Sequence, residues 1–185
     1  MNKTIKLIFV LFLFSIKLFA QKEGQDFCKG DVKGSYFPLE ISKKKIHWYT
    51  TSYTEELIGE KNIDGNLYKV FDQLWENGDK YTLYLREVNN IVFEYDLKSK
   101  KDFIRYDKTF DINHTWKTPN WGNYKLLSYT DKLATPYCVY NNLMSIEVKI
   151  NKQTYIFYYL KGYGYVGAVK DKTVISYVSP EVKFD

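Results

Sequence analysis

The feature that most restricts the fold is a side-chain alternation with a period of two residues, which recurs along most of the chain. It is clearest between Thr154 and Val178, where Tyr, Phe, Val and Ile predominate. Successive side chains of an extended strand point to opposite faces, and branched or aromatic residues pack well on a pleated sheet. The pattern predicts three strands here. The first of them, around Tyr155–Leu160, is apolar on both faces, as expected in the middle of a covered sheet.

Short polar turns separate the other alternating stretches. Asp64-Gly65 and Asn77-Gly78 are typical of tight hairpin turns, and no stretch has the 3.6-residue apolar period of a helix. About ten strands joined by short turns must curl to protect the edges of their sheet. The sequence therefore predicts an all-β fold with little helix, a single antiparallel meander curled into a half-barrel or an open barrel. A β-sandwich is the alternative.

Two strands illustrate how faces are assigned from this pattern. Ile46–Tyr53 is interpreted as one strand, with Trp48 on one face and Tyr49 and Tyr53 on the other. In the stretch Ile91–Asp96, the same rule directs three residues inward: Ile91, Phe93 and Tyr95.

The first 20 residues have the pattern of an export signal. Lys3 and Lys6 precede an apolar run from Leu7 to Ile16, and the small residue Ala20 marks a cleavage site before Gln21. The run is shorter than the roughly 20 residues that a membrane-spanning helix needs. We expect a signal peptide over 1–20, an N-terminal extension over 21–34 and a single β domain over 35–185. The product would be exported to the periplasm or the extracellular space, without a transmembrane anchor.

The charge of the chain gives little support for a nucleic-acid partner. Three of its 27 basic residues lie in the segment 1–20, which has no acidic residue, and the remaining 24 face 22 acidic ones. The mature protein is therefore nearly neutral, and we expect no nucleic-acid binding.

The two cysteines, Cys28 and Cys138, both remain after export. An even number of cysteines in an oxidising compartment predicts a disulfide between them.

The chain lacks a recognisable catalytic or metal-binding motif. Two histidines and two cysteines that pair with each other are too few for a metal site, and no metal or other cofactor is expected. Gly162, Gly164 and Gly167 match a dinucleotide-binding pattern, but a strand and not a helix follows them. We expect these glycines to relieve crowding where the sheet bends, and we do not expect an enzyme.

The candidate binding residues are aromatic. Tyr and Trp combine a broad apolar face with a polar tip, which suits the stacking of a sugar or the wall of a lipid-binding groove. Trp121 would be presented by a loop, whereas Trp48, Tyr49 and Tyr159 lie on strands. The first hypothesis is an exported, non-enzymatic binding domain whose curved aromatic sheet holds an apolar (lipid) or glycan ligand. The alternative is a protein-interaction module of the envelope, such as an assembly factor or an immunity-type partner of a toxin.

Several short motifs spread over the chain carry a resemblance to a known group. They are Cys28 with Tyr36–Leu39, Ile63–Val70, Tyr84–Glu87, Val92–Asp96, Asp111–Trp116 and Tyr158–Gly167. Together they resemble small exported β-sheet proteins of Bacteroidetes-type bacteria. The resemblance implies a β-rich envelope protein, and it transfers neither an activity nor a functional residue. Asn113-His114 departs from the group, which often has Gly-Asp before Thr-Trp.

Overall fold

The computed structural model describes residues 28–118 and 122–180, and these residues form twelve β-strands and no helix. The strands are β1 (Lys43–Trp48), β2 (Thr51–Ile63), β3 (Asn66–Trp75), β4 (Lys80–Val88), β5 (Ile91–Asp96), β6 (Lys101–Asp107), β7 (Thr115–Thr118), β8 (Gly122–Ala134), β9 (Val139–Ile150), β10 (Gln153–Leu160), β11 (Gly164–Lys170) and β12 (Thr173–Ser179).

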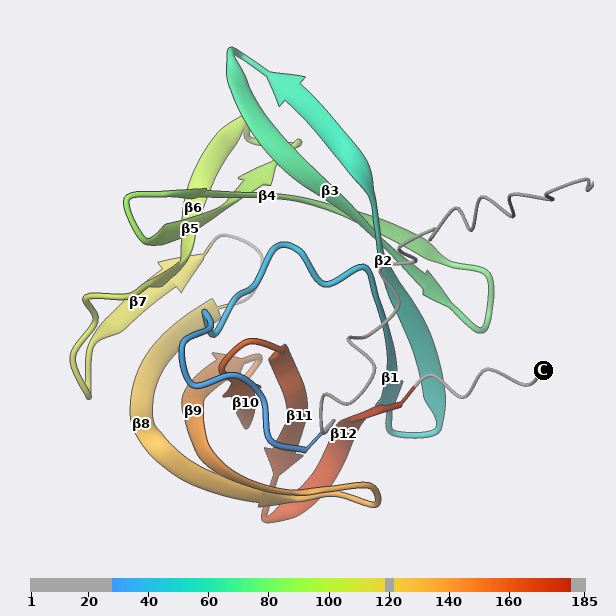
Figure 1. Ribbon diagram of the computed structural model, residues 1–185, viewed down its shortest axis with the longest axis vertical. Coiled ribbons are helices and arrows are strands. Elements are labelled where there is room, and N and C mark those ends of the chain that lie inside the picture. Colours follow the sequence, from blue (N-terminus) through green and yellow to red (C-terminus); the bar gives the residue numbers. More distant parts are fainter. Residues whose placement is uncertain (1–27, 119–121, 181–185) are drawn as a thin grey trace, which may run out of the picture.

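All twelve strands belong to one antiparallel sheet that is nearly closed into a barrel (Figure 1). Their order is β6-β5-β4-β3-β2-β1-β12-β11-β10-β9-β8-β7, so the first and last strands pair with each other. The sheet edges are β6 and β7, which are neighbours in the sequence and face each other across one unsealed seam. The prediction of an antiparallel meander curled into an open barrel is confirmed, and β10 lies mid-sheet between β9 and β11 as expected.

One strand assignment was wrong. The stretch predicted as a single strand, Ile46–Tyr53, contains the β1–β2 turn, in which Tyr49 adopts a positive φ of 53°. The turn sets Ile46 directly opposite Tyr53, so the two side chains share a face instead of lying on opposite faces. The sequence concealed the turn because tyrosine favours strands and rarely has a positive φ.

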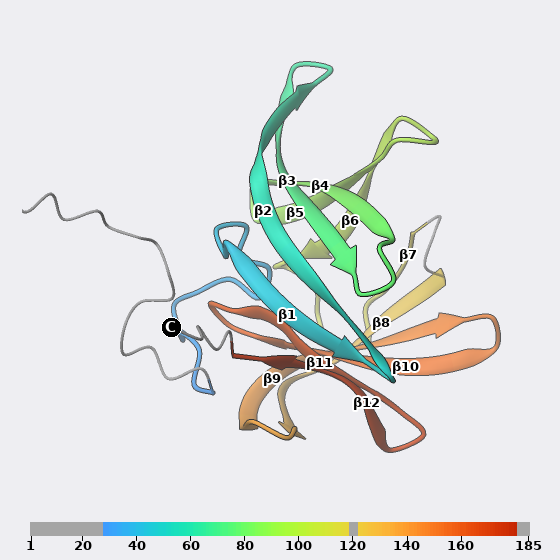
Figure 2. The ribbon, with the colours of Figure 1, turned by 90° about the vertical axis from the view of Figure 1, so that its right-hand side faces the viewer.

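Residues 28–42, here called the strap, cross one end of the barrel before β1 begins (Figures 1 and 2). The disulfide Cys28–Cys138 ties the start of the strap to the β8–β9 hairpin, which confirms the predicted bridge. The backbone N–H of Asp31 donates to the carbonyl of Lys161 at 2.8 Å, and that of Gly162 donates to Ser35 at 2.7 Å. The strap therefore closes this end of the barrel over the β10–β11 turn.

Glycine permits this close contact between strap and turn. A Cβ added to Gly34 would lie 2.4 Å from the Cα of Gly162, a separation too short for any side chain. Gly162 itself has a φ of +74°, and its own added Cβ would lie 2.6 Å from the Cβ of Asp31. Gly34 and Gly162 are thus required by backbone packing.

Both faces of the C-terminal half of the sheet are covered. The far end of β8 folds back over β11, where an added Cβ on Gly167 would lie 2.8 Å from the Leu133 side chain. Leu133, Tyr140 and Leu143 of this hairpin are buried in one core cluster with Tyr158. On the inner face, a second cluster packs the strap residues Tyr36 and Phe37 against aromatic and aliphatic side chains of the barrel: Val92, Tyr106, Leu126, Met144, Ile146, Val148 and Tyr159.

The predicted inward face of β5 was wrong. Val92 is only 1% exposed and joins the inner core, whereas Ile91, Phe93 and Tyr95 are half-buried on the opposite face. That outer face has its own cover, because Tyr95 packs on a small third cluster around Tyr68.

Candidate ligand-binding site

The inner face of the barrel carries a continuous aromatic surface. Trp48 lies opposite Ser176, and Phe157 lies opposite Ala168, which in turn pairs with Ser176. Side chains of directly opposed residues share a face, so Trp48 and Phe157 meet, with their rings stacked at 6.0 Å. Tyr53 of β2 belongs to the same surface and stacks on Trp75 of β3 at 4.6 Å.

Burial of this surface changes along the barrel. Near the strap, Lys44 is 7% and Tyr159 is 8% exposed. Toward the other end of the same strands, Trp48 and Phe157 are only half-buried, as are Tyr53 and Trp75. The protein's own side chains therefore fill the strap end of the barrel but leave aromatic rings accessible toward the opposite end. We call this partly open inner surface the aromatic cup; it comprises Trp48, Tyr53, Trp75, Phe157, Tyr159 and Tyr165, with the charged residues Glu55, Glu94 and Arg105.

Ring contacts connect the accessible end of the cup with its closed end. Phe157 lies 6.0 Å from Tyr165, and Tyr165 lies 5.9 Å from Tyr159 in an edge-to-face arrangement. Tyr159 packs on Phe37 of the strap at 4.6 Å. The aromatic residues thus form one connected wall from Trp48 down to the strap.

A β-bulge directs the main cation of the cup inward. Phe93 pairs with Ile104 and Val92 pairs with Tyr106, so Arg105 is an extra residue in β6. Bulges re-aim side chains, and this one turns Arg105 to the same side as the buried Tyr106. There its Nη1 donates to Glu94 Oε2 at 2.5 Å. The Arg105 side chain keeps 31% of its surface exposed, so solvent reaches into the cup.

The ionisable groups of the cup influence one another from several strands. Burial disfavours the charged guanidinium of Arg105, but the adjacent Glu94 carboxylate favours it, and the pKa of Arg105 is raised. Burial is the largest cause of the raised pKa values of Tyr53, Tyr159 and Tyr165. At neutral pH the cup therefore presents neutral tyrosines around a charged Arg105–Glu94 pair.

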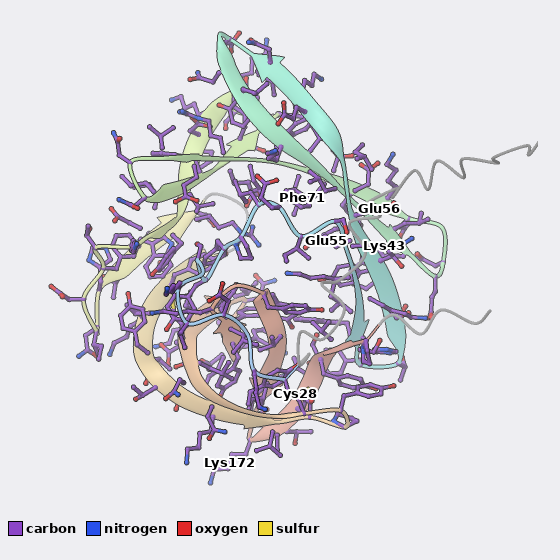
Figure 3. All side chains as sticks on the ribbon, in the orientation of Figure 1. Cys28, Lys43, Glu55, Glu56, Phe71 and Lys172 are labelled. Carbon is purple, nitrogen blue, oxygen red and sulfur yellow. A yellow bond between two sulfur atoms is a disulfide. The ribbon has the colours of Figure 1, made fainter. Side chains whose placement is uncertain are left out.

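Glu55 supplies a further carboxylate to the cup (Figure 3). It lies on the same face of β2 as Tyr53 and accepts a hydrogen bond of 2.7 Å from Gln73 Nε2. Glu55 also partly opposes the effect of burial on Lys44, whose pKa is nevertheless lowered. The Lys44 ammonium lies 4.9 Å from the centre of the Tyr163 ring.

The structure brings three of the four predicted binding residues to this surface or its rim. Trp48 and Tyr159 are part of the cup, and Tyr49 lies beside Trp48 at 6.0 Å in the β1–β2 turn, 56% exposed. Trp121, predicted as the residue presented by a loop, lies outside the described residues.

The sequence analysis missed the polar residues of the cup. Arg105 and Glu94 lie in strands that were assigned from alternation alone, and a bulge breaks that alternation. The one available signal was the pairing of an acidic and a basic residue on consecutive predicted strands, which cannot locate a bulge.

Within the described residues, no cluster of three or more His, Cys, Asp or Glu side chains is arranged to hold a metal ion. The same part of the chain also lacks any helix long and apolar enough to cross a membrane.

Fold and inner surface together define a class: a nearly closed antiparallel β-barrel with a large aromatic cluster inside. Comparisons with protein families, curated proteins and solved structures find no significant match for the chain.

Proposed function

We propose that the protein is an exported, non-enzymatic binding domain that holds a glycan in the aromatic cup, within the group of exported β-sheet proteins that its motifs resemble. The observation that carries the proposal is the half-burial of Trp48, Tyr53, Trp75 and Phe157 on an inward-facing surface. Rings that a folded core would normally bury remain available to a ligand. Export agrees with the disulfide Cys28–Cys138, because such bonds persist in oxidising compartments.

The chemistry of the cup favours a sugar over a purely apolar ligand. A sugar ring has apolar C–H faces that stack on aromatic rings and hydroxyl groups that need hydrogen-bond partners. The cup offers both, since Trp48 and Phe157 present ring faces while Arg105, Glu94 and Glu55 present charged donors and acceptors. An alkyl chain in the same place would lie against these charges without satisfying them.

The pKa directions in the cup favour binding over acid–base catalysis. A general acid or base works best with a pKa near the operating pH. In Tyr53, Tyr159, Tyr165 and Arg105 the pKa moves further away from neutrality, whereas burial lowers the pKa of Lys44 at the closed strap end.

The test is to screen the purified protein against a glycan array and to measure the best hit by calorimetry. We expect Trp48→Ala to weaken binding about tenfold or more, because it removes a stacking surface worth roughly 0.5–1.5 kcal/mol plus buried area. Tyr137→Ala is the matched control, since Tyr137 is 51% exposed on the β8–β9 hairpin outside the cup. The proposal fails if no glycan binds, or if both variants bind equally well. Recovery of an apolar molecule in solvent extracts, lost in Trp48→Ala, would replace the glycan with an apolar ligand.

A protein-interaction module is the second candidate, and one feature favours it. The β2–β3 hairpin extends beyond the last β3–β4 pair at Lys69 and Leu85 (Figure 1), and Leu67 on this extension is 58% exposed. Ile58, at the β2 bulge nearer the barrel, is 55% exposed. If this hairpin binds a partner, the double change Ile58→Lys and Leu67→Lys abolishes cross-linking to it in the native host, whereas Trp48→Ala does not.

A further inference from the structure

A second concave site lies on the opposite face of the sheet from the aromatic cup. It has a volume of about 460 Å³ and is an open depression between the folded end of β8 and the surface formed by β10, β11 and β12. Its apolar lining includes Leu133, Ile156, Tyr158, Val169 and Val174. This volume is within the range of roughly 300–1,000 Å³ that small-molecule sites occupy.

The pocket and the cup do not communicate through shared side chains. Ile156 and Tyr158 alternate along β10 with Phe157 and Tyr159, so the strand presents one pair to the pocket and the other pair to the cup. Figure 3 shows Glu55 in the middle of the ring of strands and Lys172, a pocket residue, at its outer edge.

The apolar lining of the pocket is accessible. Ile156, Val169 and Val174 are only half-buried, although they pack against the fully buried part of the same core. Covering such partly exposed apolar side chains with an alkyl chain removes apolar surface from water. This stabilises the complex by about 0.8 kcal/mol per buried CH₂.

The lining of the pocket carries a net positive charge. Lys132 and Lys172 both belong to it, against one acidic residue, Asp171. Among residues 28–118 and 122–180, neither lysine makes an ion pair, and both are exposed. An apolar pocket with cations in its lining is complementary to a molecule that has an alkyl chain and an anionic end.

We propose that this pocket binds a long-chain carboxylate, with the acyl chain on Ile156, Val169 and Val174 and the carboxylate near Lys132 and Lys172. The site is independent of the aromatic cup and does not depend on the function proposed for it.

The experiment is calorimetric titration with a homologous series of saturated fatty acids, each below its micelle concentration, and with the alcohols of equal chain length. We expect affinity to rise about fourfold per added CH₂ until the pocket is full. The acids should bind about two- to fivefold more tightly than the alcohols, because exposed charge pairs contribute at most about 1 kcal/mol.

Variants separate the two parts of the site. Lys132→Gln with Lys172→Gln should remove the preference for acids over alcohols while keeping the dependence on chain length, whereas Lys108→Gln, an exposed lysine outside the pocket, should change neither. Ala134→Trp should abolish binding by filling the pocket from an exposed position, with the fold checked by circular dichroism.

Equal affinities along the series, equal binding of acids and alcohols by the unchanged protein, or unaltered binding by Ala134→Trp would overturn the proposal. Trp48→Ala is expected to leave fatty-acid binding unchanged. The fatty-acid result therefore stands even if the cup binds no glycan.

Discussion

At the residue scale, two buried tyrosines differ in whether their hydroxyl groups have a partner. Tyr140 is 0% exposed, and its hydroxyl finds no hydrogen-bond partner among the described residues. Tyr68 is 1% exposed and donates to Asp102 Oδ1 at 2.8 Å. Burying an unpartnered polar group costs about 1–3 kcal/mol, whereas a buried hydrogen bond stabilises the fold.

Removing each hydroxyl group should therefore change the free energy of unfolding in a different way. Tyr140→Phe should leave the free energy of unfolding unchanged or raise it by about 1 kcal/mol, because it removes a group that gains nothing. Tyr68→Phe should lower it by about 1–2 kcal/mol, because it leaves Asp102 with one bond fewer. Urea denaturation of both variants measures these changes. Equal losses of unfolding free energy would show that the Tyr140 hydroxyl has a partner.

Lys44 makes a pH-dependent prediction at the same scale. Its pKa is lowered, mainly by burial, so the folded protein releases the Lys44 proton at a lower pH than the unfolded chain does. Between the lowered pKa and 10.5 the unfolded state binds more protons, and this residue's contribution to stability rises with pH. Below that range the penalty for the buried charge is fully present.

Lys44→Met should therefore stabilise the protein at pH 7, by about 1 kcal/mol, and the advantage should shrink as the pH approaches 10. The measurement is the difference in unfolding free energy between variant and unchanged protein across this pH range. A difference that does not vary with pH would contradict it. Lys45→Met, at an exposed neighbouring position, is the control.

At the scale of the elements, alternation and turn residues predicted most of the sheet but not its irregularities. Asp64 and Gly65 have the positive φ values, 51° and 81°, that the Asp-Gly signal predicts. Tyr49 has a positive φ without any such signal, and Arg105 forms a bulge without glycine. Both irregularities are set by the pairing of whole strands, which local propensity does not contain.

The difference between local patterns and strand pairing also explains which residues of the candidate site could be predicted. Of the aromatic residues in the cup, Trp48 and Tyr159 could be predicted because aromatic residues on an alternating strand line a sheet face. Tyr53 was placed on the face opposite Trp48, because the β1–β2 turn between them was missed. Glu94 and Arg105 could not be predicted, because they meet only after the bulge at Arg105 and the curling of the sheet. The half-open state of the cup was equally invisible, since it depends on how far the strap fills the barrel.

The contact between strap and sheet makes a prediction at this scale. Gly34→Ala would place a methyl group 2.4 Å from the Gly162 Cα, so the strap must shift. We expect a loss of about 1–3 kcal/mol, the usual cost of overpacking, with faster hydrogen exchange at the Asp31 and Gly162 amides. Ser42→Ala, at an exposed strap position, should change stability by less than about 0.5 kcal/mol. Unchanged exchange in Gly34→Ala would show that the strap does not depend on this contact.

At the scale of the whole molecule, the barrel is closed by contacts between the two ends of the described chain. β1 pairs with β12, while the seam lies between β6 and β7, in the middle of the sequence. Pairing β1 with β12 thus closes a very long loop, and the contacts of the closed sheet must offset the entropy that this closure costs. The disulfide Cys28–Cys138, with a sequence separation of 110, shortens the same search by restricting the unfolded chain.

Removing this bond should therefore affect global stability more than any single core contact. Cys28→Ser with Cys138→Ser is expected to lower the free energy of unfolding by about 4–5 kcal/mol, the chain-entropy value for a loop of this length. Guanidinium denaturation with and without reductant measures it: reductant should destabilise the unchanged protein and leave the double variant unaffected. Because Cys28 holds the start of the strap, the variant should also expose Tyr36 and Phe37, detectable as increased hydrogen exchange there. Full stability without the bond would mean that the strap and the β1–β12 pairing hold the closed end of the barrel unaided.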